Sequence, residues 1–317
     1  MRVSEEAVAF VFPGQGSQFV GMGQELATYP EARQVYAQAD EVLGFALSRL
    51  CLEGPEAELN DTINTQPAIL ASSVAALRVL ESRTSLKGQL KMVAGHSLGE
   101  FSAWVCAGAL SFPDALRLVR ERGRLMKVAG EQHPGGMAAV LNLDRAKLEK
   151  VCDEAARVTG QPVQVANDNC PGQVVISGAD EALERAMQQA QIAGARRVVR
   201  LAVSIAAHSP LMGHAQADFN KAVDRAPLSD PLVPIVGNVS AQPLITTRQI
   251  RTDLQAQLNA RVRWTESIEF MASQGVTVFL ELGNESVLTG LLKRINRQVS
   301  GVAIGKPQDF EHLSHLR

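Results

Sequence analysis

One short stretch of the chain constrains its fold more than any other, the pattern Gly-x-Ser-x-Gly formed by Gly95, Ser97 and Gly99. Residues 92–94 before it are apolar and predict a buried strand, and residues 100–107 after it are apolar at helical spacing. Glycines on both sides of the serine allow a strand and a helix to approach closely around a tight turn. The stretch therefore predicts a nucleophile elbow with Ser97 at its apex, and we expect the helix to start at Ser97. The alternative is a Gly/Ser turn that only caps a helix.

Composition and charge exclude several classes of protein. The chain has 317 residues, enough for one large domain or two domains, and a formal net charge of -2, which predicts no nucleic-acid partner. The apolar run near the N-terminus ends at Pro13 and is too short for a signal peptide or a membrane span, so we expect a cytoplasmic protein with no membrane partner. The cysteines are far apart in the chain and lack a C-x-x-C pair, which predicts buried free thiols and neither a metal site nor a disulfide framework.

Strands and helices alternate along most of the chain, which predicts an α/β fold with a parallel sheet covered by helices. The expected strands outside the middle of the chain are residues 7–12, 92–94, 233–238, 276–282 and 302–304. The expected helices are residues 68–80 (opened by Pro67), 111–130, 246–258, 265–273 and 286–296. Residues 31–59 predict short helices and turns.

The middle of the chain has a different pattern. Its expected strands are 137–143, 163–166, 174–177 and 197–203, with helices at 144–158 and 180–193. This order, β-α-β-β-α-β, is that of a ferredoxin-like unit. We therefore predict a small domain at 132–203, inserted into a large hydrolase-like domain at 1–131 and 204–317.

The expected helix at 111–130 carries an arginine on its apolar side. Arg122 shares one face with Leu118, Val119 and Met126, whereas the charged residues Arg117, Arg120, Arg124 and Lys127 lie on the opposite face. A buried guanidinium is costly unless an anion meets it. The anion is either part of a ligand or the carboxylate of a structural ion pair.

His208 is the histidine best placed for chemistry. It follows an expected strand and precedes Ser209 and Pro210, which can cap and open a helix. The usual esterase order of serine, acid and histidine is not met, because no acidic residue stands at a strand end of the large domain before His208. A histidine oriented by a backbone carbonyl can replace that triad.

The first expected strand ends in a glycine-rich turn at residues 13–18. A dinucleotide-binding loop is disfavoured there, because Phe19 stands where the third glycine belongs. The turn instead can aim the backbone N–H of Gln15 at a neighbouring site.

Several motifs together resemble one known family. They are Phe12-Pro13-Gly14-Gln15-Gly16-Ser17-Gln18, Gln66-Pro67-Ala68, Gly95-His96-Ser97-Leu98-Gly99-Glu100, Arg120-Glu121-Arg122-Gly123, Asn167-Asp168-Asn169, Val175-Ile176-Ser177-Gly178, His208-Ser209-Pro210-Leu211-Met212 and Val287-Leu288-Thr289-Gly290-Leu291. Over almost its whole length the chain resembles the malonyl-CoA:acyl carrier protein transacylases of fatty-acid synthesis and the related acyltransferase domains of polyketide synthases.

The resemblance implies roles for individual residues. Ser97 would carry the malonyl group, His208 would be the general base and acid, and the carbonyl of Gln257 would hold the histidine ring. The N–H groups of Gln15 and Leu98 would form the oxyanion hole. The substrate-binding residues would be Arg122 (for the malonyl carboxylate), Met126, Asn167, Asn169 and Gln66.

The resemblance further implies malonyl-CoA as substrate and acyl carrier protein as partner, with no cofactor and no metal, and we expect a monomer. A stand-alone polyketide acyltransferase, a serine acyl hydrolase and a non-catalytic carrier-binding protein remain as alternatives. The chain departs from the family pattern at Arg261, where the family usually has proline, and at Asn284-Glu285, where it usually has Pro-Gly. In polyketide acyltransferases, two tetrapeptides are associated with the choice of malonyl or methylmalonyl groups. Residues 205–207 before His208 match neither of them, which leaves open which extender group this chain selects.

Overall fold

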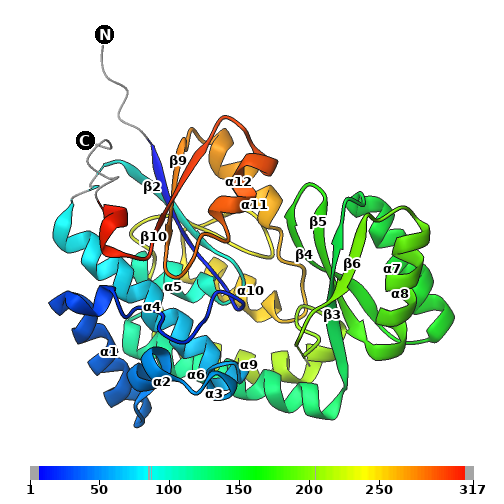
Figure 1. Ribbon diagram of the computed structural model, residues 1–317, viewed down its shortest axis with the longest axis horizontal. Helices are drawn as coiled ribbons and strands as arrows, with labels where there is room; N and C mark the ends of the chain where they lie inside the picture. Colours follow the sequence, from blue (N-terminus) through cyan, green and yellow to red (C-terminus); the bar gives the residue numbers. More distant parts are fainter. Residues whose placement is uncertain (1–6, 85, 87, 204, 311–317) are drawn as a thin grey trace.

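The computed structural model describes residues 7–84, 86, 88–203 and 205–310, and it contains two sheets (Figure 1). The larger sheet has the strand order β10-β9-β1-β2-β7-β8. Its strands are β1 (Val8–Phe12), β2 (Leu90–Gly95), β7 (Ile235–Val236), β8 (Pro243–Leu244), β9 (Val278–Leu282) and β10 (Ser300–Ile304). All neighbouring pairs are parallel except β7 with β8, so the predicted parallel α/β sheet is confirmed.

Helices cover both faces of this sheet. They are α1 (Pro30–Leu43), α2 (Leu47–Glu53), α3 (Glu56–Leu59), α4 (Thr62–Arg83), α5 (Gly99–Cys106), α6 (Phe112–Gln132), α9 (Gly213–Arg225), α10 (Thr247–Gln257), α11 (Trp264–Ser273) and α12 (Thr289–Ile295), with short 3-10 turns at Leu26–Thr28 and Pro210–Met212. Strand β1 explains why the helices lie on two sides. Its residues Phe10 and Phe12 join the core formed with α1, α4, α5, α6 and α9, whereas Ala9 and Val11 join a second core with α11 and α12. Successive side chains of a strand point to opposite faces, so a strand covered on both sides is apolar throughout.

The smaller sheet is antiparallel and lies beside the rest of the molecule (Figure 1). Its strands, in the order β4-β5-β3-β6, are β3 (Gly135–Leu141), β4 (Val163–Cys170), β5 (Gln173–Ala179) and β6 (Arg197–Arg200). Helices α7 (Arg145–Thr159) and α8 (Asp180–Ile192) pack on one face. The order of elements is the one predicted from the sequence, and residues 132–203 remain our predicted extent for the small domain.

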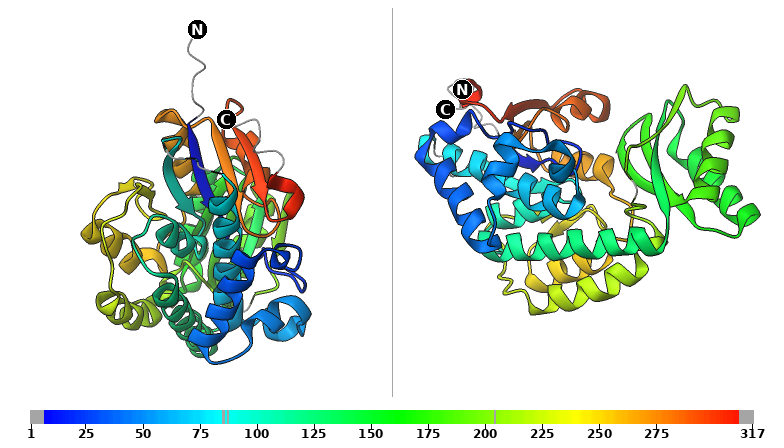
Figure 2. Two further views of the ribbon diagram at one scale, coloured as in Figure 1. Left: turned by 90° about the vertical axis from the view of Figure 1, so that its left-hand side faces the viewer. Right: turned by 60° about the horizontal axis from the view of Figure 1, so that its bottom comes forward.

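The other face of the small sheet is also apolar. Met137, Ala166 and Val175 form a separate buried cluster there, with Ala207 packed against it. Helix α6 leads directly into β3, and in the right-hand view of Figure 2 it runs toward the small sheet. One end of α6 therefore belongs to the large core and the other end approaches the small unit.

The start of α4 corrects one prediction. Pro67 was expected to open this helix, but the helix begins at Thr62, with the Asp61 side chain accepting from the N–H of Ile63. A proline inside a helix leaves the carbonyl four residues earlier without its usual partner. That carbonyl belongs to Ile63, and it accepts a hydrogen bond from Nη1 of Arg120 at 2.9 Å. The arginine therefore replaces the bond that Pro67 cannot make, and Arg120 is not simply a solvated charge on the outer face of α6.

Other boundaries differ by a few residues. Helix α6 continues past Gly130 to Gln132, and α5 starts at Gly99 rather than at Ser97. Strand β7 is only two residues long, because most of the predicted strand at 233–238 lies in loops. The cysteines Cys51, Cys152 and Cys170 are buried free thiols as predicted, and Cys106 is a half-buried one.

Within the described part of the chain, no helix is both long and apolar enough to cross a membrane.

Candidate active site

The Gly-x-Ser-x-Gly stretch forms the sharp turn predicted from the sequence. Ser97 follows β2 with a φ of 51°, a left-handed conformation that costs about 1–2 kcal/mol for a residue with a side chain. A Cβ atom on Gly95 would lie 2.0 Å from the carbonyl carbon of Gly99, and one on Gly99 would lie 2.1 Å from the carbonyl oxygen of Phe12. Glycine is therefore required at both positions, and the strained serine stands at the carboxyl end of a parallel strand.

Ser97 is hydrogen-bonded to the predicted histidine. Its Oγ lies 2.8 Å from Nε2 of His208, and the other ring nitrogen, Nδ1, lies 2.9 Å from the carbonyl oxygen of Gln257 and 3.1 Å from that of Ala260. Carbonyl oxygens only accept, so Nδ1 carries the proton and Nε2 accepts from the serine. The backbone-held histidine predicted from the missing acid is the arrangement found.

Burial controls the charge of this histidine. His208 is 3% exposed. Burial, together with the positive charge of Arg122, lowers the pKa of His208 to about 3, while the carbonyls of Gln257 and Ala260 act in the opposite direction. The ring is therefore neutral at pH 7 and can take a proton from Ser97.

Arg122 lies against the serine, on the inward side of α6 as predicted. It is 1% exposed, and its Nη2 is 3.2 Å from Ser97 Oγ and 3.0 Å from Oε1 of Gln257. Its Nη1 is 2.9 Å from Oε1 of Gln66. Burial lowers the pKa of Arg122 to about 10, against the influence of Glu100, so the group stays charged at neutral pH.

The partners of Arg122 favour one of the two hypotheses left open by the sequence, an anionic ligand over a structural ion pair. Two neutral amide oxygens hold its guanidinium, and among the residues that the structure describes no carboxylate forms a salt bridge with it. Its Nε also has no hydrogen-bond partner there. A buried cation held in this way is suited to an anionic ligand.

A cavity of about 720 Å³ opens in front of these groups. Its wall includes the predicted site residues Gln15, Ser97, Leu98, Arg122, Met126, Asn167 and His208. Met137, Val175 and Leu201, from β3, β5 and the segment after β6, close the opposite side. In the described residues, the N–H groups of Gln15 and Leu98 have no hydrogen-bond acceptor, so both are free to bind an oxygen in the cavity.

The remaining predicted residues, Gln66, Asn169 and Gln257, are not part of the cavity lining but contact residues that are. Gln66 is fully buried and contacts Arg122, with its Nε2 3.4 Å from the sulfur of Met126. Asn169 places Oδ1 2.8 Å from Nε2 of His96. Gln257 contributes its carbonyl to His208 and its side-chain amide to the carbonyl of Ser97 at 3.1 Å.

Two buried residues that the sequence did not single out support the elbow. Asn238 accepts from the N–H of Ser97 at 2.6 Å through Oδ1 and donates from Nδ2 to the carbonyl of Gly95 at 2.6 Å. Glu100 accepts from the Asn238 N–H at 3.3 Å and from the side-chain amide of Gln257. Burial, aided by the negative charge of Asp253, raises the pKa of Glu100 well above its usual value. The end of the predicted strand at 233–238 was a signal for Asn238, and Glu100 ends the motif Gly95-His96-Ser97-Leu98-Gly99-Glu100, although that motif did not indicate its hydrogen bonds.

Within the described ranges, no cluster of three or more histidine, cysteine, aspartate or glutamate side chains is arranged to hold a metal ion.

Comparison with known proteins agrees with this geometry. Residues 9–306 match the family described as acyl transferase domain. The chain is 45% identical to the malonyl CoA-acyl carrier protein transacylase of Salmonella typhimurium over 300 residues, which cover 94% of this chain and 96% of that protein. It is 44% identical to the protein of the same name from Bacillus subtilis over 305 residues, covering 96% and 95% of the two chains. The chain is also 41% identical over 303 residues to the polyketide biosynthesis protein ThaF of Burkholderia thailandensis, covering 95% of this chain and 25% of that protein.

Solved structures give the same result. The malonyl CoA-acyl carrier protein transacylase from Coxiella burnetii superposes with a TM-score of 0.95 at 38% identity, covering 98% of each chain. A malonyl-transacylase solved in complex with its type II polyketide synthase acyl carrier protein superposes with a TM-score of 0.93 at 43% identity, covering 98% of this chain and 100% of that one. From its sequence, its fold and the serine–histidine pair in its cavity, the chain belongs to the acyl transferase domain family.

Proposed function

We propose that this protein transfers the malonyl group of malonyl-CoA to the phosphopantetheine thiol of an acyl carrier protein, through an ester on Ser97. The observation that carries the substrate is Arg122, a buried cation 3.2 Å from the attacking oxygen and held by neutral amides. An acyl group on Ser97 that ends in a carboxylate can form a bidentate pair with this guanidinium, whereas an acetyl group cannot. The malonyl donor and the carrier acceptor named for the relatives support this choice.

The first half of the reaction acylates the enzyme. Ser97 Oγ attacks the thioester carbonyl while His208 Nε2 takes its proton, and the N–H groups of Gln15 and Leu98 bind the resulting oxyanion. Collapse of the tetrahedral intermediate breaks the carbon–sulfur bond, and the departing CoA thiolate takes the proton from His208. One oxyanion-hole donor contributes about 10²–10³ in rate in well-studied hydrolases.

The second half returns the enzyme to its starting state. The carrier thiol gives its proton to His208 and attacks the Ser97 ester, and Ser97 leaves as an alcohol that recovers this proton. Attack by a thiol forms a new thioester, whereas attack by water would hydrolyse the intermediate. The reaction needs a nucleophile, a base and an oxyanion hole, so the proposal includes no cofactor. As separate parts of the proposal, the enzyme is a monomer and works in the cytoplasm.

A direct assay tests the proposal. Malonyl-CoA and a purified carrier protein bearing phosphopantetheine are mixed with the enzyme, and the carrier is weighed by mass spectrometry. We expect a malonyl adduct on the carrier, formed much faster than free malonate. Rapid release of malonate with no carrier adduct would instead establish a hydrolase.

The pathway of the acceptor is a second question. The chain is similar to a polyketide biosynthesis protein and to a transacylase bound to a polyketide carrier. An acyl carrier protein of polyketide synthesis is therefore an alternative acceptor. We propose fatty-acid synthesis, because the transacylases of Salmonella typhimurium and Bacillus subtilis are covered almost completely at 45% and 44% identity, whereas this chain covers only 25% of the polyketide protein ThaF. Comparing kcat/KM for a fatty-acid carrier and a polyketide carrier tests this choice, and a clear preference for the polyketide carrier would reverse it.

A further inference from the structure

Gln164 of β4 connects the small sheet to the backbone of the active-site histidine. Its side-chain Nε2 donates to the carbonyl oxygen of His208 at 2.8 Å and to that of Asn259 at 2.8 Å. These carbonyls are 44 and 95 residues away from Gln164 in the chain. One amide nitrogen therefore joins the backbone of the histidine to a loop in a distant part of the sequence.

That loop is the one that orients the histidine ring. Asn259 lies between Gln257 and Ala260, whose carbonyl oxygens lie 2.9 and 3.1 Å from Nδ1 of His208. The histidine also has a φ of 58°, a conformation that persists only when surrounding contacts hold it. Gln164 thus fixes both ends of the same interaction, the backbone that carries the ring and the loop that accepts from it.

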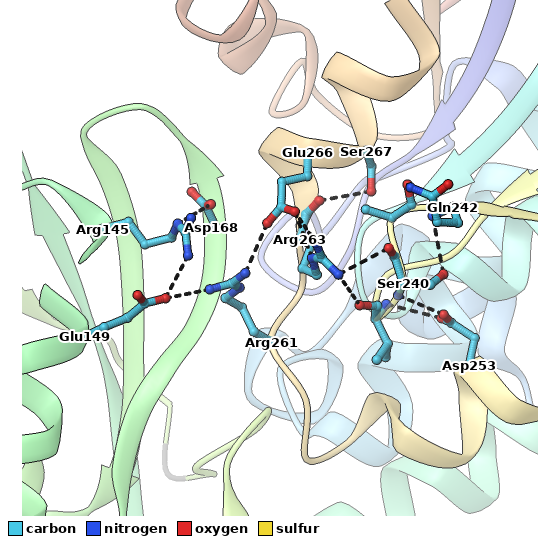
Figure 3. A network of polar contacts seen from close by, with 12 residues as sticks. Arg145, Glu149, Asp168, Ser240, Gln242, Asp253, Arg261, Arg263, Glu266 and Ser267 are labelled. Atoms are coloured by element: carbon cyan, nitrogen blue, oxygen red, sulfur yellow. Dashed lines mark hydrogen bonds and ion pairs between the residues drawn. The ribbon is translucent and has the colours of Figure 1, made fainter. Parts of the chain in front are cut away.

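The same loop is attached to the small sheet at a second place. The N–H of Val262 donates to the carbonyl of Ala166 at 2.8 Å, and the N–H of Asp168 donates to the carbonyl of Val262 at 2.9 Å. Arg261 adds ion pairs to Glu149 of α7 at 2.7 Å and to Glu266 of α11 at 3.0 Å (Figure 3). These contacts hold residues 261 and 262 against β4 and α7, but none of them reaches His208.

We propose that Gln164 is a positioning residue for His208. By holding the carbonyls of His208 and Asn259 together, it keeps Nδ1 within reach of the Gln257 and Ala260 carbonyls, so that Nε2 stays unprotonated and faces Ser97. The inference rests on the proposed function insofar as that function uses His208 as the base. The predicted consequence is kinetic: the chemical step slows, while substrate binding through Arg122 is retained.

The experiment uses two variants of Gln164 and one control in the full-length protein. Gln164→Met keeps the length of the side chain but removes its donor, and Gln164→Asn keeps the amide but withdraws it by one methylene group. Gln161→Met is the matched control, because the Gln161 amide donates to Glu181 within the small unit at 2.9 Å. For each protein we would measure the melting temperature, the single-turnover rate of malonyl-enzyme formation and the KM for malonyl-CoA.

A second readout does not depend on activity. Nitrogen-15 NMR of the histidine rings reports which ring nitrogen carries the proton, and the His208 signal is identified by its loss in His208→Ala. The intact protein should show one tautomer, protonated at Nδ1, and both Gln164 variants should show a mixture. Because this measurement needs no substrate, it tests the role of Gln164 even if the malonyl assay were to disprove the proposed function.

We expect Gln164→Met and Gln164→Asn to slow acylation about tenfold or more, since small misplacements of catalytic groups are costly, with KM changed less than about twofold. Gln161→Met should retain the rate and the single tautomer. The inference is overturned if folded Gln164→Met keeps the single tautomer, whether its acylation rate equals that of the unsubstituted protein or falls below it. It is also overturned if Gln161→Met shows the same losses of rate and of the single tautomer. If Gln164→Met does not fold, Gln164→Asn decides by the same criteria.

Discussion

Nη2 of Arg122 is 3.2 Å from Oγ of Ser97, so a buried positive charge and the attacking atom lie within one hydrogen bond of each other. The guanidinium reaches this position because Gln66 and Gln257 bind it with amide oxygens that carry no net charge. An acyl chain bound to the serine would place its far end in the same space. This arrangement favours a short acyl group ending in a carboxylate.

Replacing Arg122 with alanine should separate malonyl from acetyl substrates. Removing one partner of a buried charge pair typically costs about 3–5 kcal/mol, so kcat/KM for malonyl-CoA should fall by about a hundredfold or more. The value for acetyl-CoA should change little, because acetyl-CoA has no carboxylate on its acyl group. Both specificity constants and the melting temperature are measured on the same preparation.

Arg120→Ala serves as the control for this prediction, because Arg120 lies on the same helix but binds the Ile63 carbonyl outside the cavity. It should leave the ratio of the two specificity constants unchanged. Equal losses for both substrates in Arg122→Ala, with a lowered melting temperature, would show that Arg122 is only structural.

Acylation should resist mildly acidic pH. An unperturbed histidine titrates near pH 6.5, and a base of that kind would lose activity as the pH falls through this value. Burial and Arg122 lower the pKa of His208 to about 3, so its neutral form persists well below pH 6.5. We therefore expect the rate of malonyl-enzyme formation to show no acid limb between pH 8 and about pH 5. A half-maximal rate near pH 6.5, in protein that circular dichroism shows to be folded, would contradict this.

Asn238 should matter for both stability and rate. Asn238→Ala leaves the N–H of Ser97 and the carbonyl of Gly95 without their 2.6 Å partners. An unsatisfied buried group costs about 1–3 kcal/mol, so the free energy of unfolding in urea should fall by at least that amount and acylation should slow. Gln242→Ala, at an exposed position after the same turn, should change stability by less than about 0.5 kcal/mol. An Asn238→Ala protein as stable as the Gln242→Ala control would show that this bridge is unimportant.

Pro67 and Arg120 should be energetically coupled. Arg120→Met removes the donor to the Ile63 carbonyl, which should cost about 1 kcal/mol. Pro67→Ala restores a helical N–H four residues after Ile63, so the same Arg120 substitution should cost less in that background. A double-mutant cycle of unfolding free energies measures the difference, and strict additivity would argue against the replacement of a helical bond by Arg120.

Local patterns were sufficient to predict two residues that line the cavity, Ser97 and Arg122. The elbow depends on glycines within two positions of Ser97, and Arg122 was found from its place on an apolar helix face. For His208 only the Ser-Pro pair after it was a correct signal, since Ser209 caps the 3-10 turn at Pro210–Met212, whereas the strand expected before it ends at Arg200. These signals are local: the turn residues around Ser97 are within two positions of it, and the period of α6 determines the face that Arg122 occupies.

Two of the supporting groups, Asn238 and Gln164, were not predicted, because their partners are far away in the chain. Asn238 binds the N–H of Ser97 across 141 residues, and Gln164 binds the His208 carbonyl across 44. The start of α4 was wrong for the same reason. Proline favours the first turn of a helix, but the Asp61 cap and a contact from Arg120, 57 residues after Ile63, allow Pro67 inside it. Glu285 has a φ of 63°, at a position where the transacylases that this chain resembles usually have glycine. Nothing in the local sequence pattern predicts that a glutamate adopts this conformation.

The mass of the intact protein after brief mixing with malonyl-CoA tests most directly whether Ser97 carries the malonyl group. We expect one added malonyl group on the protein without substitutions, located on the peptide containing Ser97 and removed when a carrier thiol is added. Ser97→Ala should show no adduct at an unchanged melting temperature. A malonyl adduct of undiminished yield in Ser97→Ala would contradict the proposal that Ser97 carries the acyl group, because another residue would then carry it.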